Sequence, residues 1–307
     1  LAIVATSPLP PLLGVGGYAL GWWFPVVPAG VAAAGALAGG LVWNYATEGR
    51  QRRFLKQAFR HYLSPHVVER LIADPGQLRL GGERRELTIM FSDLAGFTSI
   101  SEALDPVALT ELLNDFLTDM TDIVLEEGGT LDKYEGDAII AFWNAPLEVP
   151  DHAARACHAA WRCQQRLAAR REEFRARTGH ALHMRVGLHT GPVVVGNMGS
   201  RQRFNYTVLG DAANLASRLE GANKAFGTAT MISGVTRAAA GAALAARDLG
   251  AVRVVGRREP VAVFELLGPA AAADVHAFDG YHAALALCRA GDAAGAAAAF
   301  AALPDDP

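Results

Sequence analysis

The sequence predicts an α+β protein built on a ferredoxin-like βαββαβ sandwich with an extra C-terminal hairpin, preceded by a membrane region and a linker helix. Three observations lead to this prediction. Strand-like and helix-like apolar patterns alternate in the βαββαβ order within residues 87–196. The first strand-like run ends at Asp93 and the third begins after Asp137, and this topology places those two ends side by side. Residues 1–47 carry no Asp, Glu, Lys or Arg, which is typical of membrane spans.

The N-terminal region, residues 1–47, is expected to hold one or two transmembrane spans of about 20 residues each. The clearer span covers residues 25–46, whereas prolines interrupt residues 1–21. Aromatic residues at both edges fit the belts found at membrane interfaces; they are Trp22, Trp23, Trp43 and Tyr45. The chain opens on Leu rather than Met, so we expect a larger N-terminal part to precede it.

A basic cluster follows the membrane region directly and consists of Arg50, Arg52, Arg53 and Lys56. Such clusters normally stay on the cytoplasmic side, so the sequence predicts an inner-membrane protein whose downstream part is cytoplasmic. Residues 48–80 fit a helical linker with a break at Ser64-Pro65. The apolar stripe of this linker could pair with its twin in a dimer or pack on its own domain, and the sequence favours neither.

Residues 81–268 form the expected globular domain, and residues 269–307 form an Ala-rich helical tail with a break at Gly291-Asp292. Within the domain, alternation predicts strands and the wider helical period predicts amphipathic helices. The expected elements are, in order, strand 87–93, helix 106–127, hairpin 130–143, helix 151–177, strand 182–189, the separate segments 190–192 and 193–196, helix 209–224 and a hairpin from 248–256 and 260–267.

Composition and spacing exclude several kinds of function. With a net charge of −3 and no basic stripe, the chain gives no support for nucleic-acid binding. Cys157, Cys163 and Cys288 lack a metal-binding spacing and are expected to be free thiols in a reducing compartment. His183 and His189 flank a strand without partners at a metal spacing, so we interpret both as structural.

Asp93 and Asp137 are the first candidate site residues. Each adjoins a strand-like run and small residues that let a backbone approach a ligand. Two carboxylates at neighbouring strand ends suit hard cations that bridge a polyphosphate. The chain has no Gly-x-x-x-x-Gly-Lys-Ser/Thr loop, which disfavours a P-loop ATPase. These residues therefore predict a nucleotide-handling enzyme of another kind.

Three ordered motifs carry a resemblance to a known family. They are Phe91-Ser92-Asp93-Leu94-Ala95-Gly96-Phe97-Thr98, Lys133-Tyr134-Glu135-Gly136-Asp137, and the run from Asn205 to Glu220 that contains Thr207, Asn214 and Arg218. With these motifs in this order, residues 81–268 resemble the catalytic domain of the class III nucleotidyl cyclases, the adenylate and guanylate cyclase family. The span, the linker and residues 62–65 resemble bacterial membrane-anchored cyclases that carry an extracellular CHASE-type sensor.

The resemblance implies that Asp93, Asp137 and the Leu94 carbonyl hold two Mg²⁺ or Mn²⁺ ions. One ion would act on the ribose 3′-hydroxyl and the other on the β- and γ-phosphates. The following turn would offer its backbone N–H groups to the phosphates. Its residues are Ala95, Gly96, Phe97 and Thr98.

The resemblance also implies roles for two pairs of side chains. Asn214 and Arg218 lie four apart on an expected helix, where the Asn would orient the ribose and the Arg would stabilise charge on the α-phosphate. Lys133 would donate to N1 of adenine, and Thr207 would accept from its N6 amino group. Guanine presents the opposite pattern, and relatives that choose GTP typically resemble Glu and Cys at these two places. The Thr form resembles a bacterial subgroup often described as bicarbonate-responsive.

The family site forms between two catalytic domains, and this chain contains both halves, so the resemblance implies a homodimer with two complete sites. One departure concerns the phosphate-binding Lys of the family, where this chain has Val255. Arg253 on the same strand face could substitute for it, Arg257 could do so instead, or the chain could bind ATP more weakly; the sequence leaves these three alternatives open. The chain is therefore expected to be a membrane-anchored adenylate cyclase that makes cyclic AMP and pyrophosphate from ATP in signal transduction. A guanylate cyclase and a catalytically silent signalling module remain alternatives.

Overall fold

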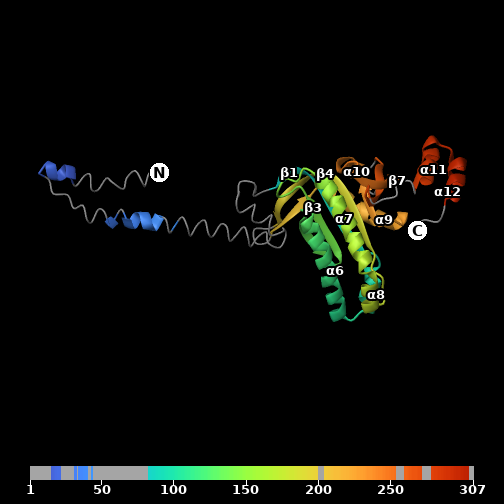
Figure 1. Cartoon of the computed structure of the whole chain (residues 1–307), viewed down its shortest axis with the longest axis horizontal. Coiled ribbons are helices and arrows are strands. Elements are labelled where there is room, and N and C mark those ends of the chain that lie inside the picture. The colour runs from blue at the N-terminus through green and yellow to red at the C-terminus, as the bar shows by residue number, and fades with distance from the viewer. Residues whose placement is uncertain are drawn as a thin grey trace. The chain divides into compact units, whose positions relative to one another are not determined.

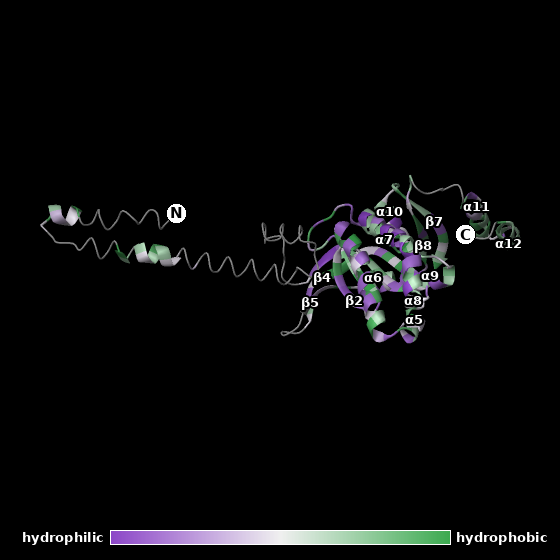
Figure 2. Cartoon of the chain, turned by 60° about the horizontal axis from the view of Figure 1, so that its bottom comes forward, coloured by the Kyte–Doolittle hydropathy of each residue, from purple (hydrophilic) through white to green (hydrophobic). Residues whose placement is uncertain are grey.

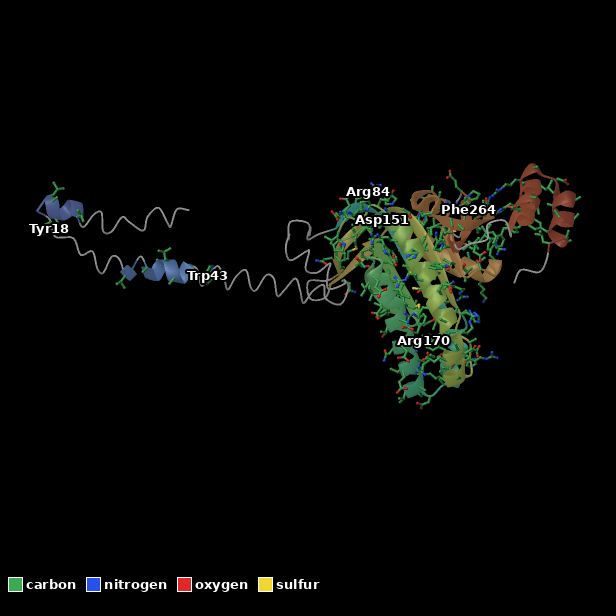
Figure 3. All side chains as sticks on the ribbon, viewed as in Figure 1. Tyr18, Trp43, Arg84, Asp151, Arg170 and Phe264 are labelled. Carbon is green, nitrogen blue, oxygen red and sulfur yellow. The ribbon has the colours of Figure 1, made fainter. Side chains whose placement is uncertain are left out.

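The structure is a computed structural model that describes residues 15–21, 31–32, 34–40, 43, 82–199, 204–253, 259–271 and 278–303 (Figure 1). The chain divides into two compact units, Leu1–Phe59 and Arg60–Pro307. In the first unit the backbone is helical at residues 15–19, 31–32, 34–40 and 43, and the side chains of Tyr18 and Trp43 are exposed (Figure 3). Among the described residues, none of the helices combines the length and the apolar character needed to cross a membrane. The predicted span and the linker fall mostly or wholly outside the described residues and stay predictions.

The described part of the second unit contains one mixed sheet of eight strands. The strands are β1 Glu83–Leu94, β2 Thr130–Glu135, β3 Ala138–Trp143, β4 Met184–Gly199, β5 Phe204–Leu209, β6 Thr230–Ser233, β7 Leu244–Val252 and β8 Val261–Pro269. They follow the order β2-β3-β1-β4-β6-β8-β7, and β5 pairs with β4 beside this path. The order β2-β3-β1-β4 confirms the predicted ferredoxin-like core, and β7 with β8 confirms the C-terminal hairpin.

The helices of the second unit pack on this sheet or extend from its end (Figure 1). They are α5 Phe97–Ala103, α6 Pro106–Glu126, α7 His152–Ala169, α8 Arg171–Thr178, α9 Asp211–Phe226, α10 Gly234–Ala240, α11 Asp279–Ala290 and α12 Ala293–Ala301. The helix α6 begins where the sequence allows it, because the Asp105 carboxylate accepts a hydrogen bond from the Val107 N–H at 3.0 Å and Pro106 occupies the first turn. It ends before Gly128, whose φ of 75° favours glycine.

The main core lies between the sheet and the helices α6 and α7, which run side by side over one face. Strand side chains alternate between faces, so even-numbered residues of β1 and β4 such as Met90 and Val186 enter this core. Odd-numbered residues of the same strands, among them Asp93 and Gly187, lie on the opposite face, which α9 covers. Asp93 thus lies on a face of the sheet that the main core does not occupy.

Two predicted elements differ from the structure. The single helix expected over 151–177 is two helices, α7 and α8, that meet at Arg170 (Figure 3). The Arg170 guanidinium bonds Asp119 on α6 and Glu173 on α8, which fixes the corner. Residues 190–192, which the sequence analysis set apart from the runs on either side, belong to the continuous strand β4. At Pro192, β4 pairs neither with β6, since that pairing ends at Leu188, nor with β5, since that pairing covers β4 only from Val194 onward, so Pro192 removes no hydrogen bond from those ladders.

The C-terminal helices confirm the predicted helical tail, and α12 is almost wholly apolar (Figure 2). The helix α11 docks on β7, because Arg289 donates to both carboxylate oxygens of Asp248 at 2.9 Å and the Arg247 guanidinium lies over the rings of Phe278 and Tyr281. The cysteines are free thiols, as predicted: Cys157 and Cys163 of α7 are buried, and Cys288 of α11 is exposed.

Candidate active site

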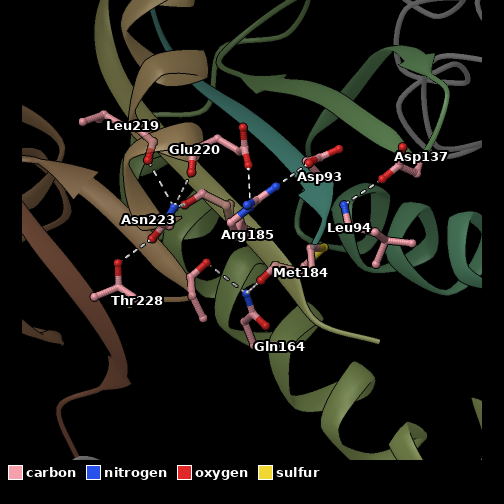
Figure 4. Close-up of polar contacts among 12 residues, drawn as sticks. Asp93, Leu94, Asp137, Gln164, Met184, Arg185, Leu219, Glu220, Asn223 and Thr228 are labelled. Atoms are coloured by element: carbon pink, nitrogen blue, oxygen red, sulfur yellow. Dashed lines mark hydrogen bonds and ion pairs between the residues drawn. The ribbon is translucent and has the colours of Figure 1, made fainter. Parts of the chain in front are cut away.

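Asp93 and Asp137 meet at the ends of adjacent strands, as the topology predicted. The strands β1 and β3 pair antiparallel with Ser92 opposite Ile139, which puts Asp93 beside the tight turn at Gly136 and Asp137. Gly136 has a φ of 67°, which lets the chain reverse there. The Asp137 carboxylate accepts a hydrogen bond from the Leu94 N–H at 2.9 Å, which ties the turn to the end of β1 (Figure 4).

The carboxylate of Asp137 is costly to ionise in this position. Burial, as the largest cause, and the nearby charge of Asp93 raise its pKa to about 6, while the hydrogen bond from the Leu94 N–H opposes both effects. A bound cation would offset the cost of ionising these two adjacent carboxylates. Carboxylates and a backbone carbonyl are the hard oxygen donors that Mg²⁺ and Mn²⁺ prefer, so the donor set of Asp93, Asp137 and Leu94 fits these ions. Within the described residues, no group of three or more His, Cys, Asp and Glu side chains is arranged to hold a metal.

Arg185 is a residue of this site that the sequence analysis missed. It lies directly opposite Asp93 in the β1–β4 ladder, and its Nη2 is 2.7 Å from Asp93 Oδ2 (Figure 4). Its Nε donates to Glu220 Oε1 on α9 at 3.1 Å. The pKa of Glu220 is raised by burial and by Asp93. Arg185 thus joins the candidate metal ligand Asp93 to α9, and only the cross-strand register, which the sequence does not supply, reveals it.

The turn after β1 uses one of its four predicted phosphate donors within the protein itself. The Ala95 N–H donates to the His183 carbonyl at 2.7 Å, and Gly96 adopts a φ of 74° before the helix α5 begins at Phe97. The first N–H groups of a helix have no acceptor within it, and Phe97 and Thr98 hold such positions. Their role in phosphate binding stays a prediction.

Lys133 and Thr207 come together through a third residue, Asp132. Thr207 Oγ1 of β5 donates to Asp132 Oδ2 at 2.7 Å, and Lys133 Nζ lies 3.7 Å from Asp132 Oδ1. The register of β2 against β3 shifts between Leu131 and Lys133, so Asp132 is the extra residue of a β-bulge. The sequence analysis did not single out Asp132, although an acidic residue inside a buried strand beside a lysine was an available signal.

Asn214 and Arg218 lie on α9, as predicted, with Asn214 exposed and Arg218 partly exposed. The helix begins at Asp211 after the N-cap Gly210, so Asp211 is not the N-cap residue. Its carboxylate stands in the first turn instead, where the helix dipole favours negative charge. Within the described part of the chain, no hydrogen bond or ion pair joins Asn214 or Arg218 to the two aspartates at the end of β1, or to the group of Asp132, Lys133 and Thr207.

A glycine sets the distance between α9 and the sheet. A Cβ atom at Gly187 of β4 would lie 2.2 Å from the backbone nitrogen of Glu220 and 2.3 Å from the carbonyl oxygen of Ala216. The backbone of α9 therefore contacts the strand directly at this point. Arg185, two residues earlier on β4, reaches Glu220 from the same face.

The other predicted residues have simpler surroundings. Arg253 follows the last residue of β7 and is exposed, and Val255 and Arg257 lie outside the described residues. The interpretation of His189 as structural fits its burial and its contact with Ser233 Oγ at 2.7 Å. His183 is exposed.

Comparisons with known proteins agree with this geometry. The family described as the adenylate and guanylate cyclase catalytic domain matches residues 82–267. Adenylate cyclase 1 of Rhizobium meliloti (strain 1021) is 37% identical over 185 residues, which are 60% of this chain and 28% of that protein. The chain spans less than half the length of the curated relatives it matches.

Two solved structures resemble the domain about equally. The adenylyl cyclase CyaB from P. aeruginosa is 35% identical with a TM-score of 0.58, covering 61% of this chain and 96% of that one. The guanylyl cyclase Cya2 is 34% identical with a TM-score of 0.59, covering 64% and 98%. Fold similarity alone therefore does not separate ATP from GTP as the substrate, and the choice rests on the side chains.

Proposed function

The chain belongs to the adenylate and guanylate cyclase catalytic-domain family, and we propose that it is an adenylate cyclase that converts ATP to 3′,5′-cyclic AMP and pyrophosphate. The observation that carries the choice of ATP is the arrangement of Lys133, Asp132 and Thr207. A lysine ammonium only donates hydrogen bonds, which suits N1 of adenine, and a hydroxyl that has already donated to a carboxylate can accept from the N6 amino group. Guanine carries a donor at N1 and an acceptor at O6. Its N1 donor would therefore face the Lys133 donor, and its O6 acceptor would face the acceptor oxygen of Thr207.

The catalytic part of the proposal rests on the cluster at the end of β1. Two Mg²⁺ or Mn²⁺ ions, held by Asp93, Asp137 and the Leu94 carbonyl, would supply activation of the ribose 3′-hydroxyl and neutralise phosphate charge. The Asp137 carboxylate is held in place by the Leu94 N–H. Arg218 would stabilise charge at the α-phosphate, since a guanidinium presents fixed donors and stays protonated. The Asn214 side chain would orient the ribose.

We further propose that the active form is a homodimer. Lys133, Thr207, Asn214 and Arg218 share one chain with Asp93 and Asp137, but no hydrogen bond or ion pair among the described residues joins those four directly to the two aspartates. A second copy would bring complementary halves together twice, as a two-fold dimer allows. The same proposal includes anchoring to the inner membrane through residues 1–47, with the catalytic domain on the cytoplasmic side.

The purified chain should be assayed with ATP and with GTP, each with Mg²⁺ and with Mn²⁺, and the products separated by chromatography. We expect cyclic AMP to dominate, and Asp93→Ala to abolish its formation while the thermal melt stays that of a folded domain. Equal or greater formation of cyclic GMP would favour a guanylate cyclase. No cyclic product with either nucleotide would favour a signalling module without activity.

A further inference from the structure

Asp132 places a carboxyl group at a buried position of the sheet, where acidic side chains are uncommon. Its side chain is 2% exposed, on a strand whose neighbours Leu131 and Thr130 are also buried. Acidic side chains are almost never buried so completely unless other groups pair with them, because removing the charge from water is costly. A bulge at this position interrupts the alternation of side chains along β2, and the Asp132 carboxylate contacts Thr207 of β5.

The two oxygens of Asp132 have different surroundings. Oδ2 accepts the hydrogen bond from Thr207 Oγ1 at 2.7 Å. Oδ1 is buried without a hydrogen-bond partner in the described part of the protein, and Lys133 Nζ at 3.7 Å is close enough for charge attraction but too far for a hydrogen bond. Burial raises the pKa of Asp132, while the Thr207 hydroxyl and the charge of Lys133 oppose that rise and favour the carboxylate.

We infer that Asp132 is a specificity-determining residue, which fixes the Thr207 hydroxyl as a hydrogen-bond acceptor toward the 6-position of the purine. A carboxylate only accepts, so the single hydrogen of the Thr207 hydroxyl must point to Asp132, and only lone pairs remain for the base. A threonine without this partner could rotate and offer either a donor or an acceptor. The inference rests on the proposed adenylate cyclase function and names the positioning residue behind its choice of base.

The substitution Asp132→Asn tests this because it keeps the shape of the side chain. Its amide oxygen should turn to the ammonium of Lys133, which leaves the NH₂ group facing Thr207. That hydroxyl would then accept from the amide and donate toward the base, which suits an oxygen at the purine 6-position. We expect the ratio of kcat/KM for ATP over ITP to fall about tenfold, since each hydrogen bond gained or lost contributes roughly threefold to tenfold.

Purine riboside triphosphate, which has no substituent at the 6-position, separates recognition from structure. If Asp132 orients Thr207, Asp132→Asn should lower turnover of ATP more than turnover of this analogue. In a Thr207→Val background, Asp132→Asn should no longer change the ratio of ATP to ITP. Glu135→Gln is the matched control, because Glu135 is an exposed carboxylate on the same strand, and it should leave the ratio as in the wild type.

The outcomes separate the two proposals. If the wild type makes no cyclic AMP, the proposed function is wrong. If the wild type does and Asp132→Asn lowers turnover of all three nucleotides by the same factor, Asp132 only holds β5 against β2 and the inference is overturned. Thermal melts of each variant show whether such a common loss reflects unfolding, and an unchanged ratio in a folded variant also overturns the inference.

Discussion

The contact between α9 and β4 at Gly187 gives a sharp test of the structure. In Gly187→Ala the new methyl group would lie 2.2 Å from a backbone nitrogen of α9, whereas ordinary contact begins at 3.4 Å. The helix would have to move away by the difference, about 1.2 Å, because a backbone atom cannot rotate aside as a side chain can. Asn214 and Arg218 move with the helix that carries them.

Two measurable losses should follow from Gly187→Ala. Overpacking of this kind typically costs about 1–3 kcal/mol, which would lower the melting temperature by about 2–4 °C for each kcal/mol in a domain of this size. A displacement of about 1 Å in catalytic residues can cost about 10²-fold in rate, so kcat should fall by about that factor. Calorimetry and a cyclic AMP assay measure the two effects separately.

The control is Gly221→Ala, within α9 itself. A Cβ at Gly221 meets nothing within 4 Å, so alanine there should stabilise the helix by about 0.5–1 kcal/mol and leave kcat close to the wild type. A Gly187→Ala protein that melts and turns over like the wild type would refute the close approach of α9 to the sheet. A loss in both variants would show that α9 tolerates no substitution and that the contact is not the cause.

Four further predictions concern the site. Mixing Asp93→Ala chains with Arg218→Ala chains should recover about one quarter of wild-type activity, because about half of the dimers would be mixed and each would have one intact site; chains that exchange without recovery contradict the shared site. Since burial raises the pKa of Asp137 to about 6, the rise in melting temperature caused by Mn²⁺ should shrink as the pH falls through 6. In the metal-free protein, the stability should change with pH in the opposite direction. An acid whose folded pKa lies above its ordinary value of 3.8 stabilises the fold at low pH, and this contribution is lost as the pH rises to 6. Arg185→Gln should lower the melting temperature of the metal-free domain and tighten Mn²⁺ binding, since Arg185 neutralises Asp93 and competes for it; weaker Mn²⁺ binding would contradict this competition. Arg253→Ala should raise KM for ATP if this side chain replaces the family lysine, and an unchanged KM would show that it does not contact phosphate.

The sequence predicted those parts of the fold that depend on local pattern. Apolar runs beside turn residues placed β1 and β3, and the topology that follows from them predicted that Asp93 and Asp137 meet. The strand β6 was missed because four residues are too short for a periodic signal, and its pairing with β4 is parallel and distant in sequence.

The site residues that the sequence analysis did not predict were missed for the same physical reason. Arg185 and Glu220 are 35 positions apart, and their contact depends on how α9 lies against β4, which no local pattern encodes. Asp132 depends on a bulge, which shifts the alternation of side chains by one residue without a change that the sequence displays. Long-range register, more than residue type, limited what could be predicted.

The three cysteines differ in exposure, so their chemical labelling can report the opening of the core. Burial raises the pKa of Cys157 and of Cys163 to about 12, and both lie on α7 inside the main core, so neither forms the reactive thiolate while the core is closed. Cys288 is exposed on α11. An alkylating reagent should therefore add one label to the native protein, and the mass should rise by two more labels only in molecules whose core has opened. Counting labels by mass spectrometry over time would measure how often the core opens under native conditions, without any engineered probe.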